Sequence, residues 1–94
     1  EGYAYWFESI TIGKKISSGL SKLRLEMNRG CVYRDIGAST ILVASIDNTL
    51  TRSIDAYNYG VTISVSGNNL LTQVSGSSLE TVNWVTTLKY QKIG

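Results

Sequence analysis

The sequence predicts an all-β fold, an antiparallel two-sheet sandwich or jelly roll built from about eight short strands. Val, Ile, Thr and Tyr fill its patterned segments, which is the composition of strands. Clusters of Gly, Ser and Asn interrupt these segments at short intervals. No segment reads as the helical crossover that a parallel sheet requires. With 94 residues the chain has room for one core, so residues 1–94 are expected to form a single β-domain.

The first half of the chain contains five candidate strands. Residues 3–12 are rich in aromatic and β-branched side chains. In residues 21–28, leucines and a methionine alternate with charged residues, which favours a strand with its charged side chains in water; helical spacing of Leu20, Leu23 and Met27 leaves a helix as the alternative. Residues 31–34, 38–46 and 49–56 follow. The continuous apolar run at 38–46 is typical of a central strand that is covered on both faces.

The second half predicts a hairpin and a long closing strand. Residues 61–66 alternate strictly, Gly67-Asn68-Asn69 tolerates the positive φ of a tight turn, and residues 70–74 return. After a Ser/Gly loop at 75–78, residues 79–93 form the last strand. The apolar positions of these strands predict a core of Ile10, Ile12, Leu23, Leu25, Ile41, Val43, Val61, Ile63, Val65, Val74, Val82, Trp84 and Leu88.

Missing residue types exclude much chemistry. The chain has no His, which removes His-dependent nucleophiles and the usual His-containing metal sites. Its one cysteine, Cys31, cannot form an internal disulfide, and we expect it to be a small buried thiol in a strand. The apolar runs are far shorter than the ~20 residues of a membrane-spanning helix, so we expect no membrane insertion.

The carboxylates stand singly along the chain. No DxD or calcium-loop pattern appears, and Asp35, Asp47 and Asp55 are expected to be turn residues near strand ends. We therefore predict a non-enzymatic protein with no catalytic residues, no metal site and no cofactor.

Basic residues crowd into the first third of the chain, although the net charge is only +2. Such a concentration fits either a patch that meets phosphate or an acidic polymer, or ordinary solubilisation of an exposed strand. No nucleic-acid motif accompanies it, so we expect no nucleic-acid partner. The residues concerned are Lys14, Lys15, Lys22, Arg24, Arg29 and Arg34.

Two short segments mix aromatic rings with hydrogen-bonding side chains. Saccharides present apolar CH faces beside hydroxyl groups, and a flat ring next to carboxylate, amide or guanidinium groups suits both. Tyr in a β-sandwich also commonly packs half-buried with its hydroxyl at the rim, which is the alternative for these residues. The denser aromatic group at Tyr3, Tyr5, Trp6 and Phe7 is expected in the core or in a subunit contact. The candidate ligand-binding residues are Asp55, Tyr57, Asn58 and Tyr59, with Tyr33, Arg34 and Asp35 as a smaller second group.

The organisation of the chain resembles the C-terminal receptor-binding head of a phage tail fibre or baseplate adhesin. Residues 83–94 match a closing strand with a Trp, alternating polar residues and a Lys-Ile end, and the chain starts at Glu1 without Met, as a C-terminal module of a longer protein would. The resemblance implies a homotrimer on a virion tail or fibre, or otherwise an extracellular surface, that binds a host cell-surface saccharide. It carries over no binding residue.

These observations lead to two main hypotheses. The first is a recognition domain that binds a cell-surface saccharide or receptor. The alternative is a structural oligomerisation domain, with no small ligand, whose sheet edges and aromatic first strand hold subunits together. A third interpretation, binding of an acidic polymer through residues 14–34, requires an affinity that falls steeply with salt.

Overall fold

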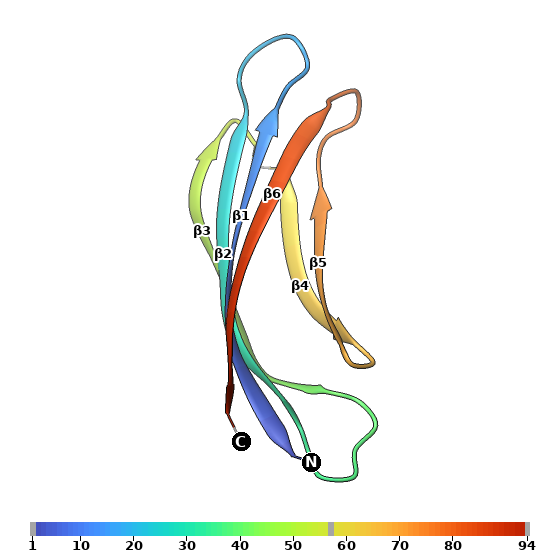
Figure 1. The fold of residues 1–94 in the computed structure, drawn as a ribbon. Coiled ribbons are helices and arrows are strands. Elements are labelled where there is room, and N and C mark those ends of the chain that lie inside the picture. The colour runs from blue at the N-terminus through green and yellow to red at the C-terminus, as the bar shows by residue number, and fades with distance from the viewer. Residues whose placement is uncertain (1, 57, 94) are drawn as a thin grey trace.

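The computed structural model describes residues 2–56 and 58–93, with the side chains of residues 50 and 51 left out. These residues contain no helix, and they form an elongated all-β body of 52 × 21 × 16 Å, which confirms the predicted fold class (Figure 1). The strands are β1 (Tyr3–Lys15), β2 (Leu23–Arg34), β3 (Leu42–Ile54), β4 (Gly60–Ser66), β5 (Asn69–Ser75) and β6 (Val82–Ile93).

The strands form two antiparallel sheets. The larger has four strands in the order β3-β2-β1-β6, and β4 and β5 form a separate two-stranded hairpin. This hairpin lies over one face of the larger sheet, and β1 begins at the same end of the molecule at which β6 finishes (Figure 1). We call the face toward the hairpin the inner face and the opposite one the outer face.

Two strands, β2 and β3, each join segments that the sequence indicated as separate strands. Gly30 does not interrupt β2, and Asp47 and Asn48 do not end β3, so four expected strands merge into two. Irregularities between Leu25 and Glu26 and between Cys31 and Val32 let β3 accommodate extra residues without losing its pairing with β2. The strand interpretation of residues 21–28 is confirmed from Leu23 onward.

The predicted hairpin is confirmed. Ser66 pairs with Asn69 across a two-residue turn, in which Gly67 adopts a φ of 59° that disfavours side chains. The Ile41 amide donates to the Gly67 carbonyl at 3.0 Å, which ties the turn to the loop before β3.

Residues 38–46 do not form a central strand. The first four of them belong to the loop, and β3 is an edge strand of the larger sheet. Val43 is 43% exposed, whereas Ile41, the residue next to the hairpin turn, is buried. The first part of the apolar run thus holds a loop against the hairpin, and the second part forms an edge strand. An unbroken apolar run therefore does not indicate a central strand here.

The core lies between the inner face and the hairpin, and it corrects the predicted one. Phe7, Val32, Ile41 and Ile63 form its buried cluster, and Val61 is also buried. Ile41, Val61 and Ile63 were predicted, and Val65 packs against the cluster. Val43, Val74 and Leu88 are more than two-fifths exposed, and Val82 and Trp84 are half-buried.

The predicted orientation of β1 and β2 is wrong. The outer face carries Ile10, Ile12, Leu23 and Leu25, while the positions that alternate with them face the hairpin. A shift of one residue in the assignment of faces moves every side chain of a strand to the other side of the sheet.

Polar side chains therefore lie inside the domain. Glu26 is 2% exposed and accepts hydrogen bonds from Arg24 Nε at 2.6 Å and Asn48 Nδ2 at 2.8 Å. Asn48 also donates to Asn28 at 2.8 Å. The two bonds of Asn48 join β2 to β3, and they explain why an asparagine lies within β3 instead of ending it.

Candidate functional site

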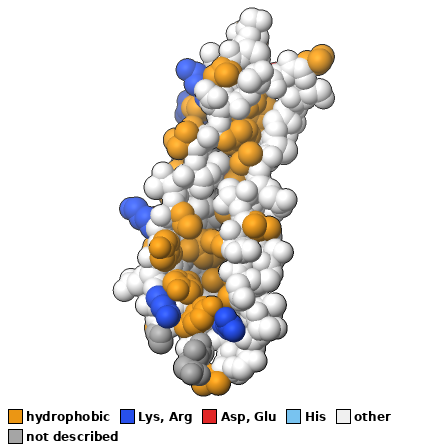
Figure 2. Space-filling model, turned by 45° about the vertical axis from the view of Figure 1, so that its right-hand side comes forward, with side chains coloured by type: hydrophobic (Ala, Val, Ile, Leu, Met, Phe, Trp, Pro, Cys, Tyr) orange, Lys and Arg blue, Asp and Glu red, His pale blue; other side chains and the backbone are white. Residues whose placement is uncertain are grey.

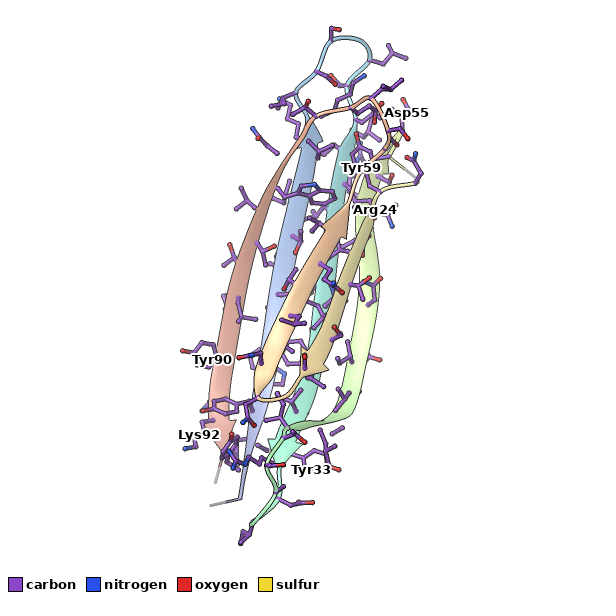
Figure 3. The ribbon with its side chains drawn as sticks, turned by 90° about the vertical axis from the view of Figure 1, so that its right-hand side faces the viewer. Arg24, Tyr33, Asp55, Tyr59, Tyr90 and Lys92 are labelled. Carbon is purple, nitrogen blue, oxygen red and sulfur yellow. The ribbon has the colours of Figure 1, made fainter. Side chains whose placement is uncertain are left out.

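The first group of predicted ligand-binding residues lies at one end of the molecule, between β3 and β4 (Figure 3). Asp55 is exposed and has a φ of 50°, as in a turn. Asn58 donates to the Ser77 hydroxyl, and Tyr57 lies outside the described residues. Tyr59 is only 2% exposed, so its ring has no free face on which a sugar could stack.

Tyr59 instead belongs to a connection between three loops. Its hydroxyl donates to Glu80 at 2.8 Å, Lys22 Nζ lies 2.7 Å from the same carboxylate, and its ring lies 5.9 Å from that of Trp84. Hydrogen bonds from Lys22 and Tyr59 hold the pKa of Glu80 below its ordinary 4.5. Burial, followed by the bond to Glu80, raises the pKa of Tyr59 above 10.0.

This connection makes stability depend on acid pH. Because the pKa of Glu80 is lower in the folded state, its contribution is complete above about pH 4.5 and is lost as the pH falls through the folded value. We expect the free energy of unfolding, measured with urea between pH 7 and 3, to fall less in Glu80→Gln than in the parent. Equal pH dependence in both proteins would contradict this role.

The second group of predicted residues lies at the opposite end of the molecule, and the fold does not bring the two groups together (Figure 3). Tyr33 pairs with Ala4 and Leu42 in the sheet and is partly exposed. Arg34 Nε donates to the Ala38 carbonyl at 2.7 Å, which holds the loop after β2. Asp35 is exposed in that loop.

The basic residues of the first third do not form one patch. Lys15 and Lys22 pair with Glu80, at 3.8 and 2.7 Å, on the side of the hairpin. Arg24 pairs with Glu26 inside the domain. Lys14 and Arg29 occupy outer-face positions of β1 and β2, several residues apart. Ion pairs and strand positions thus keep apart the basic residues that the sequence suggested could form a single patch.

An aromatic pocket of about 280 Å³ lies between the larger sheet and the turn of the hairpin. Tyr3 and Tyr5 meet edge to face with ring centres 5.3 Å apart, and Tyr90 lies 6.1 Å from Tyr5. Figure 3 shows Tyr90 and Lys92 in the lower half of the molecule. In the space-filling view, hydrophobic side chains are exposed in that half, with Lys and Arg beside them (Figure 2). We call this the tyrosine pocket, and it is lined by Tyr3, Tyr5, Phe7, Val32, Ile41, Asn68, Leu70, Leu88 and Tyr90.

Pairing between the first and last strands builds the tyrosine pocket. Tyr90 lies opposite Phe7, and Lys92 opposite Tyr5, so inward-facing side chains of β1 and β6 become neighbours. Lys92 Nζ lies 5.1 Å from the centre of the Tyr3 ring, at a distance typical of a cation–π contact. The hairpin turn adds the amide of Asn68. The sequence shows the period-two spacing of Tyr3 with Tyr5 and of Tyr90 with Lys92, but it does not show that these two pairs are neighbours in the sheet.

A second, more polar pocket of about 330 Å³ lies beside β4. Its side chains include Arg24, Glu26, Asn28 and Asn48, most of whose polar groups already bond to one another. The Asn28 amide nitrogen alone lacks a protein acceptor in this set. The arrangement therefore resembles a cross-strand hydrogen-bond network more than a vacant ligand site.

Within residues 2–56 and 58–93, no group of three or more Cys, Asp or Glu side chains is placed to hold a metal ion. The same residues include no helix of the length and hydrophobicity that crossing a membrane takes. Comparison with known proteins gave no match, whether to a family model, to a curated protein or to a solved structure.

Proposed function

We propose that this domain is a non-enzymatic recognition module that binds a cell-surface saccharide in the tyrosine pocket. The observation that carries the proposal is the convergence of Tyr3, Tyr5 and Tyr90 on one open cavity. Ligand sites are typically concave and mostly apolar, with a few polar groups that orient the ligand. The tyrosine pocket combines an apolar floor with three phenol hydroxyls and one side-chain amide.

Tyr90 is the residue best placed to meet a ligand. It is 67% exposed, whereas Tyr3 and Tyr5 are half-buried and supported by the core. An exposed tyrosine ring offers a large apolar surface that loses little conformational entropy on binding. The hydroxyls and the Asn68 amide suit the hydroxyls of a sugar that lies on that ring, which favours a saccharide over a purely apolar ligand.

This proposal keeps the saccharide that the sequence suggested but moves its site. In the first predicted group Tyr59 is buried and bonded to Glu80. In the second group Arg34 is engaged with a loop carbonyl. Among the described residues, no member of either group lines the tyrosine pocket.

The proposal is tested by a glycan array followed by calorimetric titration of the saccharide that binds best. Replacing Tyr90 by alanine is expected to weaken binding about tenfold, because it removes the exposed stacking surface. Tyr90→Phe is expected to retain the stacking contribution and lose only what the hydroxyl adds.

Tyr33→Ala is the matched control, because Tyr33 is also a strand tyrosine at this end but does not line the pocket. Its affinity is expected to equal that of the parent. An array with no bound saccharide, or an equal loss of affinity in the Tyr33 and Tyr90 variants, would refute the proposal.

A further inference from the structure

The outer face of the larger sheet carries several exposed apolar side chains and is not covered by another element among the described residues. The hairpin covers the inner face instead (Figure 1). Trp6 and Ile12 are 42% and 43% exposed, and Val85, which pairs with Ile12, is 64% exposed. Contiguous apolar area on a sheet face commonly marks an interaction surface.

One row of this face carries alternating charges. Strand pairing places Glu8 between Arg29 on β2 and Lys89 on β6, and Arg29 between Glu8 and Asp47 on β3. From β3 to β6 the row therefore reads negative, positive, negative, positive. Asp47, Arg29 and Lys89 are exposed, and Glu8 is half-buried.

We infer that this face binds the same face of a second copy of the chain, related by a two-fold axis parallel to the strands and between β1 and β2. That rotation exchanges the two halves of the row. Each Glu8 then faces Arg29 of the other copy, and each Asp47 faces Lys89. A two-fold axis perpendicular to the strands at this row would instead place every charge over its like, so the charge pattern selects the first arrangement.

The apolar pairs of the two central strands fit the same arrangement. Ile10 pairs with Met27 and Ile12 with Leu25 across β1 and β2, so exchanging the two strands stacks Ile10 of one copy on Met27 of the other. A shallow hollow of about 300 Å³ lies beside Trp6, lined by Arg29, Gly30, Cys31, Ser45 and Asp47. Because Trp6 pairs with Cys31, the same exchange places one copy's Trp6 ring over the other copy's hollow.

The size of the face is sufficient for a stable dimer. At ~3.3 Å per residue and ~4.8 Å between strands, four strands of about twelve residues cover on the order of 750 Å². Each partner of a stable interface contributes ~800 Å². The tyrosine pocket lies on the inner face, so dimer formation leaves it open.

Sedimentation equilibrium and light scattering test the inference. The parent is expected to be a dimer, and Glu8→Lys is expected to weaken the dimer at least about a hundredfold, because two like-charged contacts replace two opposite ones. Asp35→Lys is the matched control: it changes the net charge equally but lies in an exposed loop, and it is expected to remain dimeric.

Mixing two charge-reversed variants shows whether Glu8 and Arg29 meet between two copies or only within one copy. Arg29→Glu alone is also expected to be monomeric. An equimolar mixture with Glu8→Lys is expected to form a heterodimer, since the introduced lysine then faces the introduced glutamate and Arg29 of one copy faces Glu8 of the other. Circular dichroism verifies that both variants fold. A monomeric parent, a trimer, equal behaviour of the Glu8 and Asp35 variants, or a mixture that stays monomeric would overturn the inference.

Discussion

Replacing Gly30 by alanine is expected to lower the free energy of unfolding by about 3 kcal/mol, at the upper end of the usual cost of overpacking a core. A methyl group at this position would overlap the Ser45 carbonyl oxygen of β3 and would lie 3.0 Å from the ring of Phe7. Phe7 is 1% exposed, and β3 is hydrogen-bonded to β2, so neither can move freely. A loss of that size is a large part of the ~5–14 kcal/mol typical of a 94-residue domain.

Gly60→Ala is the control for this experiment. Gly60 is also a strand glycine, but its added methyl group would meet only the Ser75 hydroxyl, a side-chain atom that can rotate away. Its free energy of unfolding, measured by urea titration, is expected to stay within about 1 kcal/mol of the parent. Equal stability of the two alanine variants would show that β2, β3 and Phe7 do not pack as described.

Replacing Arg24 by methionine is expected to cost about 3–5 kcal/mol, because it leaves a buried carboxylate without its cation. Glu26 is 2% exposed, and Arg24 Nε lies 2.6 Å from it. Arg24 also donates to the Ala56 carbonyl at 3.0 Å, so the variant loosens the segment between β3 and β4 as well. Urea unfolding followed by circular dichroism measures the loss.

Two further variants identify its cause. Arg52→Met removes an exposed arginine from β3 and is expected to change stability by less than about 0.5 kcal/mol. Arg24→Met combined with Glu26→Leu removes both charges and is expected to be more stable than Arg24→Met alone. If the double variant is the less stable of the two, the unpaired carboxylate is not what destabilises the single variant.

Local sequence signals predicted most of the strands. The hairpin follows from strict alternation around a turn that needs positive φ, and it is found with Gly67 in that conformation. From the sequence, Gly30 indicates a break between residues 21–28 and 31–34, because glycine usually weakens a strand. Here it lies within β2 because Phe7 and Ser45 leave no room for a side chain, a tertiary reason that local sequence does not reveal.

The sequence does not decide which face of β1 is buried, because apolar residues occur at both odd and even positions of the strand. Phe7 lies on one face, whereas Ile10 and Ile12 lie on the other. Period-two alternation reports that two faces exist, but which one is covered depends on where the β4–β5 hairpin packs. The buried Glu26 on the inner face shows that the number of apolar residues on a face does not decide which face is covered.

The sequence does not indicate the location of the candidate site either, because the residues that form it are far apart along the chain. Residues 55–59 place aromatic, amide and carboxylate groups close together in sequence, but the same chemistry serves the bond between Tyr59 and Glu80. The tyrosine pocket joins Tyr3 and Tyr5 to Tyr90 from the far end of the chain, and only the register of β1 against β6 brings them together. The residue types of the chain favour a saccharide-binding site, whereas the pairing of distant strands determines where that site lies.

The most direct test of saccharide recognition is an amide NMR titration of ¹⁵N-labelled protein with the saccharide that the array selects. We expect the shifted resonances to cluster at Tyr3, Tyr5, Asn68 and Tyr90, with the outer-face residues Ile10 and Met27 unchanged. Shifts confined to the segment 55–59, or to the outer face, would contradict a binding site in the tyrosine pocket.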